Sequence, residues 1–339
     1  MANSLRPFAP RPLHRHSAVL TIAAALMLMP SPAARAVLIQ TATGTDNTTA
    51  PPDDPGWANV GVRGIGNGVY LGDRWVLSVA HVGSGSIVLE GTTYAAEPGS
   101  AVQLTNAGEP GRSALTDLIV YRLTSEPAGL PAVAIAATAP AAGTAVTMIG
   151  SGRARGAFTE WSVNETTTPW TWTTVPSGGD YAGYGSTATR EMRWGTNAIS
   201  DAAVWITASD LSPPLDVKSL ETVFDELPGT AEAQAVNNDS GGAVFAKNGS
   251  DWELAGLIFD VRGYSGQPSP AFTAVFGNTT YSVDLAYYRP QIMAIVPEPT
   301  GATLTGLAVV AMMSWAAMAQ RSSRSTANPS RRARATREQ

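Results

Sequence analysis

The sequence predicts an all-β domain, and three observations predict it. Charged residues make up only 14% of the 339 residues, which is few for a chain with long surface helices. The chain contains 33 glycines and 24 prolines, and both residue types favour turns. Between the turns lie short apolar runs of strand length, such as residues 75–82, 117–121 and 253–258. The roughly 260 residues between the two ends of the chain are enough for a sizeable core.

The first 36 residues have the pattern of a secretory signal peptide. Three arginines precede the apolar run 18–29, and residues 34–36, Ala-Arg-Ala, place small side chains at the two positions that signal peptidase reads. A buried N-terminal helix is the alternative, but two prolines soon after the run disfavour it. We therefore expect export and a mature chain that begins at Val37.

Charge and cysteine content exclude several classes of function. Residues 37–319 contain 12 basic and 26 acidic residues, a net charge of −14, whereas nucleic-acid binding needs clustered Lys and Arg. The chain has no cysteine, which excludes disulfides, cysteine catalysis and cysteine-ligated zinc. The sequence shows no Gly-rich phosphate loop and no cluster of metal ligands. We expect no nucleic-acid partner, no metal and no cofactor.

Three separated residues could carry nucleophilic catalysis. His81 is the only histidine after the predicted signal peptide, and it follows a buried-strand pattern. Asp117 opens an apolar strand, and Ser240 lies in Asn-Asn-Asp-Ser-Gly-Gly at 237–242. Together they offer a general base, an acid and a hydroxyl nucleophile. Taken singly, each has an ordinary structural explanation, as a hydrogen-bonded histidine, a capping aspartate and a turn.

The order His81, Asp117, Ser240 resembles the triad of the trypsin/chymotrypsin-like serine proteases. An α/β-hydrolase has the serine first and a subtilisin-like enzyme has the aspartate first, so the order excludes both. Residues 68–81 resemble the strand, turn and strand that deliver the family's histidine. Other segments that resemble strands of the family are 117–123, 148–152 and 253–258. The resemblance covers about residues 37–295.

The resemblance implies a fold of two packed antiparallel six-stranded β-barrels, at about residues 37–130 and 140–290. The Ala- and Pro-rich segment 123–145 would connect them, and a short C-terminal helix would end the domain at residue 295. The aromatic-rich segment 158–186 is interpreted as a long insertion that packs onto the barrel, with a grip on substrate as the alternative.

In the mechanism that the resemblance implies, Ser240 attacks the scissile carbonyl, His81 transfers the proton, and Asp117 orients the imidazole. Backbone N–H groups of Asn238 and Ser240 would form the oxyanion hole. The family normally has glycine where this chain has Asn238. A side chain there restricts φ, so reduced activity is an open alternative.

The resemblance also places Gln234 at the floor of the specificity pocket and Val261 on its wall. Neither residue is acidic, so we expect cleavage after small or medium apolar residues rather than after Lys or Arg. A shift of two residues in the alignment would bring Glu232 to the floor instead.

An N-terminal activation pair is a further implication of the resemblance. In zymogens of the family, a new N-terminal Ile or Val inserts, and its α-ammonium pairs with the aspartate before the catalytic serine. These residues would be Val37 and Asp239 here, so signal peptidase itself could perform the activation. The alternative is that Asp239 caps a turn or pairs with an arginine.

The C-terminal end has three parts. Residues 296–299 read Val-Pro-Glu-Pro, an uncharged stretch follows to Gln320, and arginines come next. As a helix, about twenty residues cover a hydrocarbon core of roughly 30 Å. The arrangement resembles the PEP-CTERM sorting signals that exosortase-type enzymes process, which we assign to 296–324 with a transmembrane helix at about 301–320. A plain membrane anchor is the alternative, and the basic tail 325–339 is longer than such signals usually have.

These observations together predict an exported serine endopeptidase, located in the periplasm, at the cell surface or outside the cell. Its partners would be protein or peptide substrates, signal peptidase, an exosortase-type sorting enzyme and, before processing, the membrane. The alternative is a catalytically weak or inactive trypsin-fold surface module used for binding.

Overall fold

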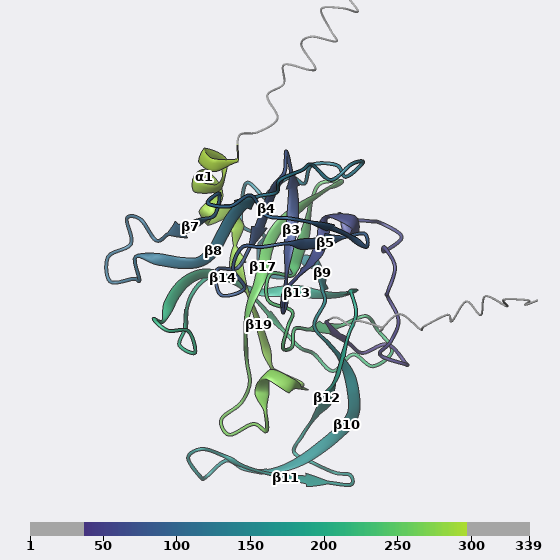
Figure 1. The fold of residues 1–339 in the computed structure, drawn as a ribbon. Helices are drawn as coiled ribbons and strands as arrows, with labels where there is room; N and C mark the ends of the chain where they lie inside the picture. Colours follow the sequence, from purple (N-terminus) through teal and green to yellow (C-terminus); the bar gives the residue numbers. More distant parts are fainter. Residues whose placement is uncertain (1–36, 297–339) are drawn as a thin grey trace, which may run out of the picture. The chain divides into compact units, whose positions relative to one another are not determined.

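The computed structural model of the chain describes residues 37–296, and over this range the protein is mostly β, as expected (Figure 1). The first sheet has seven strands in the order β6-β5-β2-β3-β4-β8-β7. These strands are β2 (Val60–Arg63), β3 (Gly66–Gly72), β4 (Trp75–Ser78), β5 (Ile87–Leu89), β6 (Thr92–Tyr94), β7 (Val102–Thr105) and β8 (Leu115–Arg122). Asp73 and Arg74, between β3 and β4, both have positive φ, 47° and 69°, as a tight hairpin turn requires.

The second sheet closes into a barrel of six strands, in the order β13-β14-β19-β17-β16-β9. Its strands are β9 (Ala145–Gly150), β13 (Arg193–Ala208), β14 (Leu215–Val223), β16 (Ala243–Asn248), β17 (Asp251–Arg262) and β19 (Thr279–Asp284). Closure depends on the length of β13, which pairs with β9 through its first half and with β14 through its second. The six-stranded barrel agrees with the expectation, whereas the first sheet has seven strands in an open order instead of the closed six-stranded barrel expected.

The aromatic-rich segment forms strands instead of the expected loop. A four-stranded sheet contains β10 (Arg153–Asn164), β11 (Thr171–Val175), β12 (Tyr181–Arg190) and β18 (Thr273–Val275). In Figure 1, β10, β11 and β12 extend away from the two larger sheets. The aromatic rings pack mainly on one another, with ring centroids 5.9 Å apart for Trp161 and Trp172 and 4.8 Å apart for Tyr181 and Tyr264. Mutual packing of these rings therefore gives the small sheet apolar contacts of its own.

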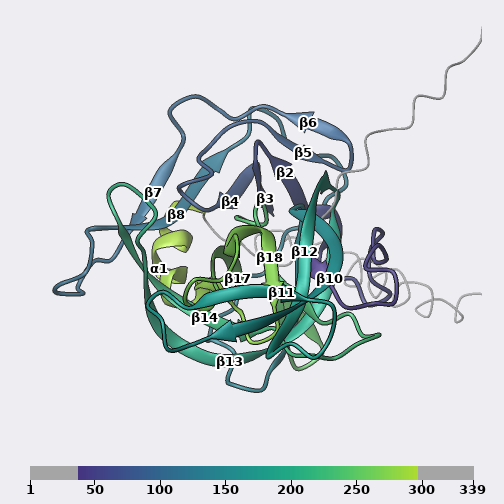
Figure 2. The ribbon, with the colours of Figure 1, turned by 90° about the horizontal axis from the view of Figure 1, so that it is seen from below.

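One hydrophobic cluster unites the two larger sheets and the C-terminal helix α1 (Leu285–Ile295), which lies where the sequence predicted a helix. Asp284 caps α1 by accepting hydrogen bonds from the amides of the second and third helical residues. The Tyr288 hydroxyl accepts from Thr116 Oγ1 at 3.0 Å and from the Lys218 amide at 3.0 Å, and it donates to Asn106 Oδ1 at 2.8 Å. Figure 2 shows the first sheet on one side and β13 and β14 on the other.

The N-terminal strand β1 (Leu38–Ile39) pairs with β15 (Ala233–Gln234), shortly before Ser240. Although residues 37–130 were assigned to the first barrel, this strand does not join the first sheet. Two arginines hold the segment that follows: Arg155 donates to the carbonyls of residues 39, 41 and 42, and Arg193 donates to those of residues 44 and 45. The start of the described chain is thereby fixed beside the serine loop.

Short 3-10 helices at Trp57–Asn59 and Pro270–Phe272 complete the described elements. No helix within residues 37–296 is both long and apolar enough to cross a membrane. The predicted signal peptide, the sorting signal with its helix at 301–320, and the basic tail fall outside the described residues.

Candidate active site

His81 and Asp117 form a closely packed pair. His81 follows β4 in a turn closed by hydrogen bonds from the amides of residues 82 and 83 to the Val79 carbonyl, and Asp117 lies within β8. One oxygen of the fully buried Asp117 carboxylate lies 2.6 Å from His81 Nδ1, and the other accepts the His81 backbone amide at 2.9 Å. These two contacts hold the imidazole so that its Nε2 is left free of the carboxylate.

The charged form of His81 is favoured by its neighbours. Burial disfavours an imidazolium and would lower the pKa, but the hydrogen bond and charge of Asp117 raise it, with smaller contributions from Asp210 and Asp260. The net effect is a pKa above the ordinary histidine value. Such an imidazole is a stronger proton acceptor during nucleophilic attack.

Ser240 lies on a tight loop that joins β15 to β16. The loop is closed by hydrogen bonds from the Asp239 amide to the Val236 carbonyl and from the Gly242 amide to the Asp239 carbonyl. The first sheet also holds the loop, because the Asn67 backbone amide donates to the Ser240 carbonyl at 2.8 Å.

Asn67 is a buried residue that the sequence reasoning missed. Its side-chain Nδ2 donates to the carbonyls of Asn238 at 3.1 Å and Ser240 at 3.3 Å, while its own carbonyl accepts from the Ser78 hydroxyl at 2.7 Å. The available signal was a polar side chain between two glycines at the start of a strand. Asn67 joins the strands that carry His81 to the loop that carries Ser240.

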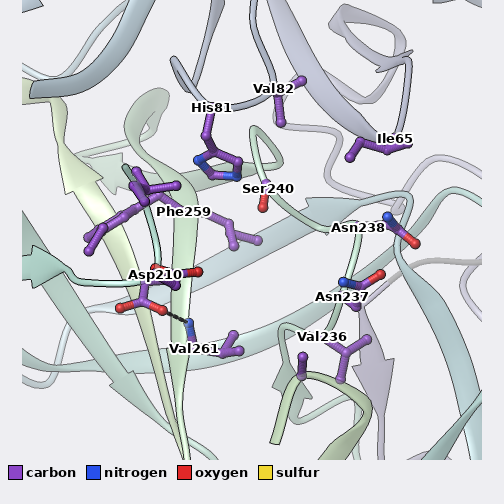
Figure 3. Close-up of a pocket in the computed structure, with 15 residues that line it drawn as sticks. Ile65, His81, Val82, Asp210, Val236, Asn237, Asn238, Ser240, Phe259 and Val261 are labelled. Atoms are coloured by element: carbon purple, nitrogen blue, oxygen red, sulfur yellow. Dashed lines mark hydrogen bonds between the residues drawn. The ribbon is translucent and has the colours of Figure 1, made fainter. Parts of the chain in front are cut away.

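His81 and Ser240 come from the two halves of the fold and line the same cavity, which has a volume of about 230 Å³ (Figure 3). The imidazole is only 23% exposed. No hydrogen bond joins the Ser240 hydroxyl to His81 within the described residues. Catalytic hydrogen bonds of this kind are often formed only when substrate is bound, so the arrangement is compatible with a nucleophile and its base.

Asn238 adopts a left-handed backbone, with φ of 78°. Among residues with a side chain, asparagine tolerates this region best. Within residues 37–296, the backbone amides of Asn238 and Ser240 donate to no acceptor. Neither N–H group is therefore engaged by another group of the described residues.

The structure brings the predicted activation pair together. Asp239 is fully buried, and its carboxylate accepts from the amides of Gly152 at 2.7 Å and Val236 at 2.9 Å. The backbone amide of Val37, which is itself fully buried, also hydrogen-bonds to this carboxylate. Burial raises the pKa of Asp239 to about 7, although these hydrogen bonds and the charge of Arg190 oppose the shift.

Of the two residues predicted for the specificity pocket, only one lines the cavity. Val261 lines the cavity, whereas Gln234 is 2% exposed in β15, pairs with Leu38 and is not among the lining residues. The lining also includes two carboxylates, those of Asp210 and of Asp260, which directly precedes Val261 on the predicted wall. Among residues 37–296, no group of three or more His, Cys, Asp or Glu side chains could hold a metal ion.

No protein-family model and no curated protein matches the sequence. Among solved structures, the chain is similar to neuropsin, a serine protease expressed in the limbic system of mouse brain, with 17% identity and a TM-score of 0.44 over 74% of this chain and 99% of that chain. It is also similar to the Ser343Ala mutant of Rv3671c from M. tuberculosis H37Rv in its inactive form, with 16% identity and a TM-score of 0.39 over 72% and 90% of the two chains.

Proposed function

We propose that the protein is an exported serine endopeptidase. The observation that carries the proposal is the short contact between His81 Nδ1 and the buried Asp117 carboxylate, on a cavity that Ser240 also lines. A base held in one tautomer beside a serine on a tight loop is the arrangement that nucleophilic acyl transfer requires. A fluorophosphonate probe should label Ser240 in the wild type and fail to label Ser240→Ala.

The proposed reaction has two similar halves. Ser240 Oγ forms a bond to the scissile carbonyl carbon, and its proton moves to His81 Nε2. The backbone amides of Asn238 and Ser240 stabilise the oxyanion of the tetrahedral intermediate. The carbon–nitrogen bond then breaks, and the leaving amine takes the proton from His81. Water attacks the acyl-enzyme by the same route, which releases the acid product and restores Ser240.

The conformation of Asn238 gives a test of the oxyanion hole. Asn238→Gly should retain activity, because glycine reaches φ of 78° without strain. Asn238→Val should lower kcat by about tenfold or more, because a β-branched residue is strained at positive φ and would rotate the N–H away. Steady-state kinetics on one peptide, with circular dichroism to check folding, measures both effects. Equal kcat values in the valine and glycine variants would show that this amide does not stabilise the reaction.

Export and sorting belong to the same proposal, and their support is the sequence pattern at the two chain ends. We propose that signal peptidase cleaves after residue 36 and that an exosortase-type enzyme removes the segment beyond the Val-Pro-Glu-Pro sequence. The mature protein from its native host should then lack everything beyond residues 296–299, including the basic tail 325–339. Intact-mass measurement decides the point, and a mass that includes the basic tail would favour a plain membrane anchor.

A further inference from the structure

The cavity that holds His81 and Ser240 is acidic along one side. Two of its lining residues are carboxylates, Asp210 on the turn between β13 and β14 and Asp260 in β17, and none is Lys or Arg. Figure 3 shows Asp210 well away from Asn238. Both carboxylates therefore line the cavity that also holds the two proposed reacting groups.

The negative charge of this side is only partly compensated. One Asp260 oxygen accepts from the Val261 amide at 2.8 Å, and the other lies 3.3 Å from Arg262 Nε. Asp210 is exposed and has no hydrogen bond or ion pair within the described residues. Of the two carboxylates only that of Asp260 has a guanidinium partner, which leaves the cavity with an excess of negative charge.

Both carboxylates act electrostatically on their surroundings. Burial raises the pKa of Asp260, and the nearby charge of Asp210 raises it further. Both residues also contribute to the raised pKa of His81. A cation placed between the two carboxylates would relieve their mutual repulsion. It would also lie close enough to His81 to interact with its charge.

We propose that Asp210 and Asp260 bind the side chain of a substrate lysine or arginine next to the scissile bond, so that the enzyme selects peptides with a basic residue at this position. The inference rests on the proposed peptidase function and names its substrate class. The same cavity can also hold an apolar side chain of the substrate, because its lining includes Val236, Ile258 and Ala271. The net negative charge of the exported region would favour encounter with such cationic peptides.

The test uses the exported, processed protein and internally quenched peptides in pairs. The two peptides of a pair differ at one position only, where one has Lys and the other has Gln. Successive pairs place this position at each residue on both sides of the scissile bond. At one position the Lys peptide should have a kcat/KM about tenfold higher. Asp210→Asn and Asp260→Asn should each bring this ratio close to one, and Asp210→Lys should favour Glu at the same position. Asp201→Asn, which removes an exposed carboxylate of β13 outside the cavity lining, is the matched control and should keep the ratio.

The outcomes separate this inference from the function on which it rests. Cleavage without a preference for Lys or Arg at any position, or a preference that Asp210→Asn leaves unchanged, overturns the inference alone. If no peptide is cleaved and Ser240 is not labelled, the peptidase function fails. The subsite can then be measured independently, because Ser240→Ala should still bind the Lys peptide more tightly than the Gln peptide in calorimetry, and Asp210→Asn in that background should abolish the difference.

Discussion

Ser240→Ala should lower the rate of casein hydrolysis by about a thousandfold or more, because no other group can form the acyl-enzyme. His81→Ala should have an effect of similar size, and the double variant should be little worse than either single one, since the two side chains act as one unit. Purified wild type and variants, compared at equal concentration with casein and with a quenched peptide, provide the measurement.

The control for this result is the folded state of the variants. Ser240 makes its contacts to the first sheet through its backbone carbonyl, so alanine should leave the thermal unfolding temperature almost unchanged. Activity that survives in Ser240→Ala would contradict the mechanism. If neither the wild type nor the variant cleaves any of a range of substrates, the alternative function is favoured, in which the protein keeps the fold for binding and does not catalyse a reaction.

A chain that begins at Val37 should be more active than one that carries an additional Met-Gly before it. In the extended chain Val37 presents a neutral amide to Asp239, whereas a free terminus presents an ammonium group. Removing one partner from a buried ion pair costs about 3–5 kcal/mol, and Asp239 adjoins Asn238 in the proposed oxyanion hole. We expect activity to fall by at least about tenfold in the extended chain, measured with the same peptide.

The pH dependence of stability gives an independent measurement of this pair. In the extended chain the pKa of Asp239 is about 7 when folded, against an ordinary value of 3.8, so between these values the folded state keeps a proton that the unfolded state has lost. Its stability should therefore fall as pH rises from about 4 to about 7, and then level off. In the chain that begins at Val37, the ammonium group favours the ionised Asp239, so the stability of this chain should fall less as pH rises.

Asp239→Asn is the control, because it removes the charge while retaining a hydrogen-bond acceptor, and the two N-terminal forms should then behave alike. Equal activity of both forms with Asp239 present, together with parallel pH profiles of the unfolding temperature, would rule out activation by the free terminus.

Much of this site could be predicted because local sequence patterns determine it. The strand, turn and strand before His81 and the apolar strand after Asp117 depend on neighbouring residues, and these patterns predicted β3, β4 and β8. β6 could not be predicted in the same way, because its three residues are exposed or half-buried and show no apolar pattern.

Other features depend on contacts between segments far apart in the sequence. Counting back from Ser240 predicted Gln234 at the pocket floor, but the pairing of β15 with β1 directs this side chain toward the Thr279 carbonyl. Asn67 and Asp210 take their places at the site only through contacts between distant segments. The glycines on either side of Asn67 mark it as unusual, but they do not indicate which loop it contacts.

The hydrogen bonds of the Tyr288 hydroxyl bear on whether the two halves of the fold are independent modules. The hydroxyl bonds Thr116 in the first sheet, Asn106 directly after β7, and Lys218 in the barrel, from a helix that follows the last described strand, β19. The shared apolar cluster crosses the same boundary. Neither half has a complete interior without the other and without the last turns of the domain. We therefore expect residues 37–296 to unfold as one cooperative unit, and neither half to fold when separated from the other.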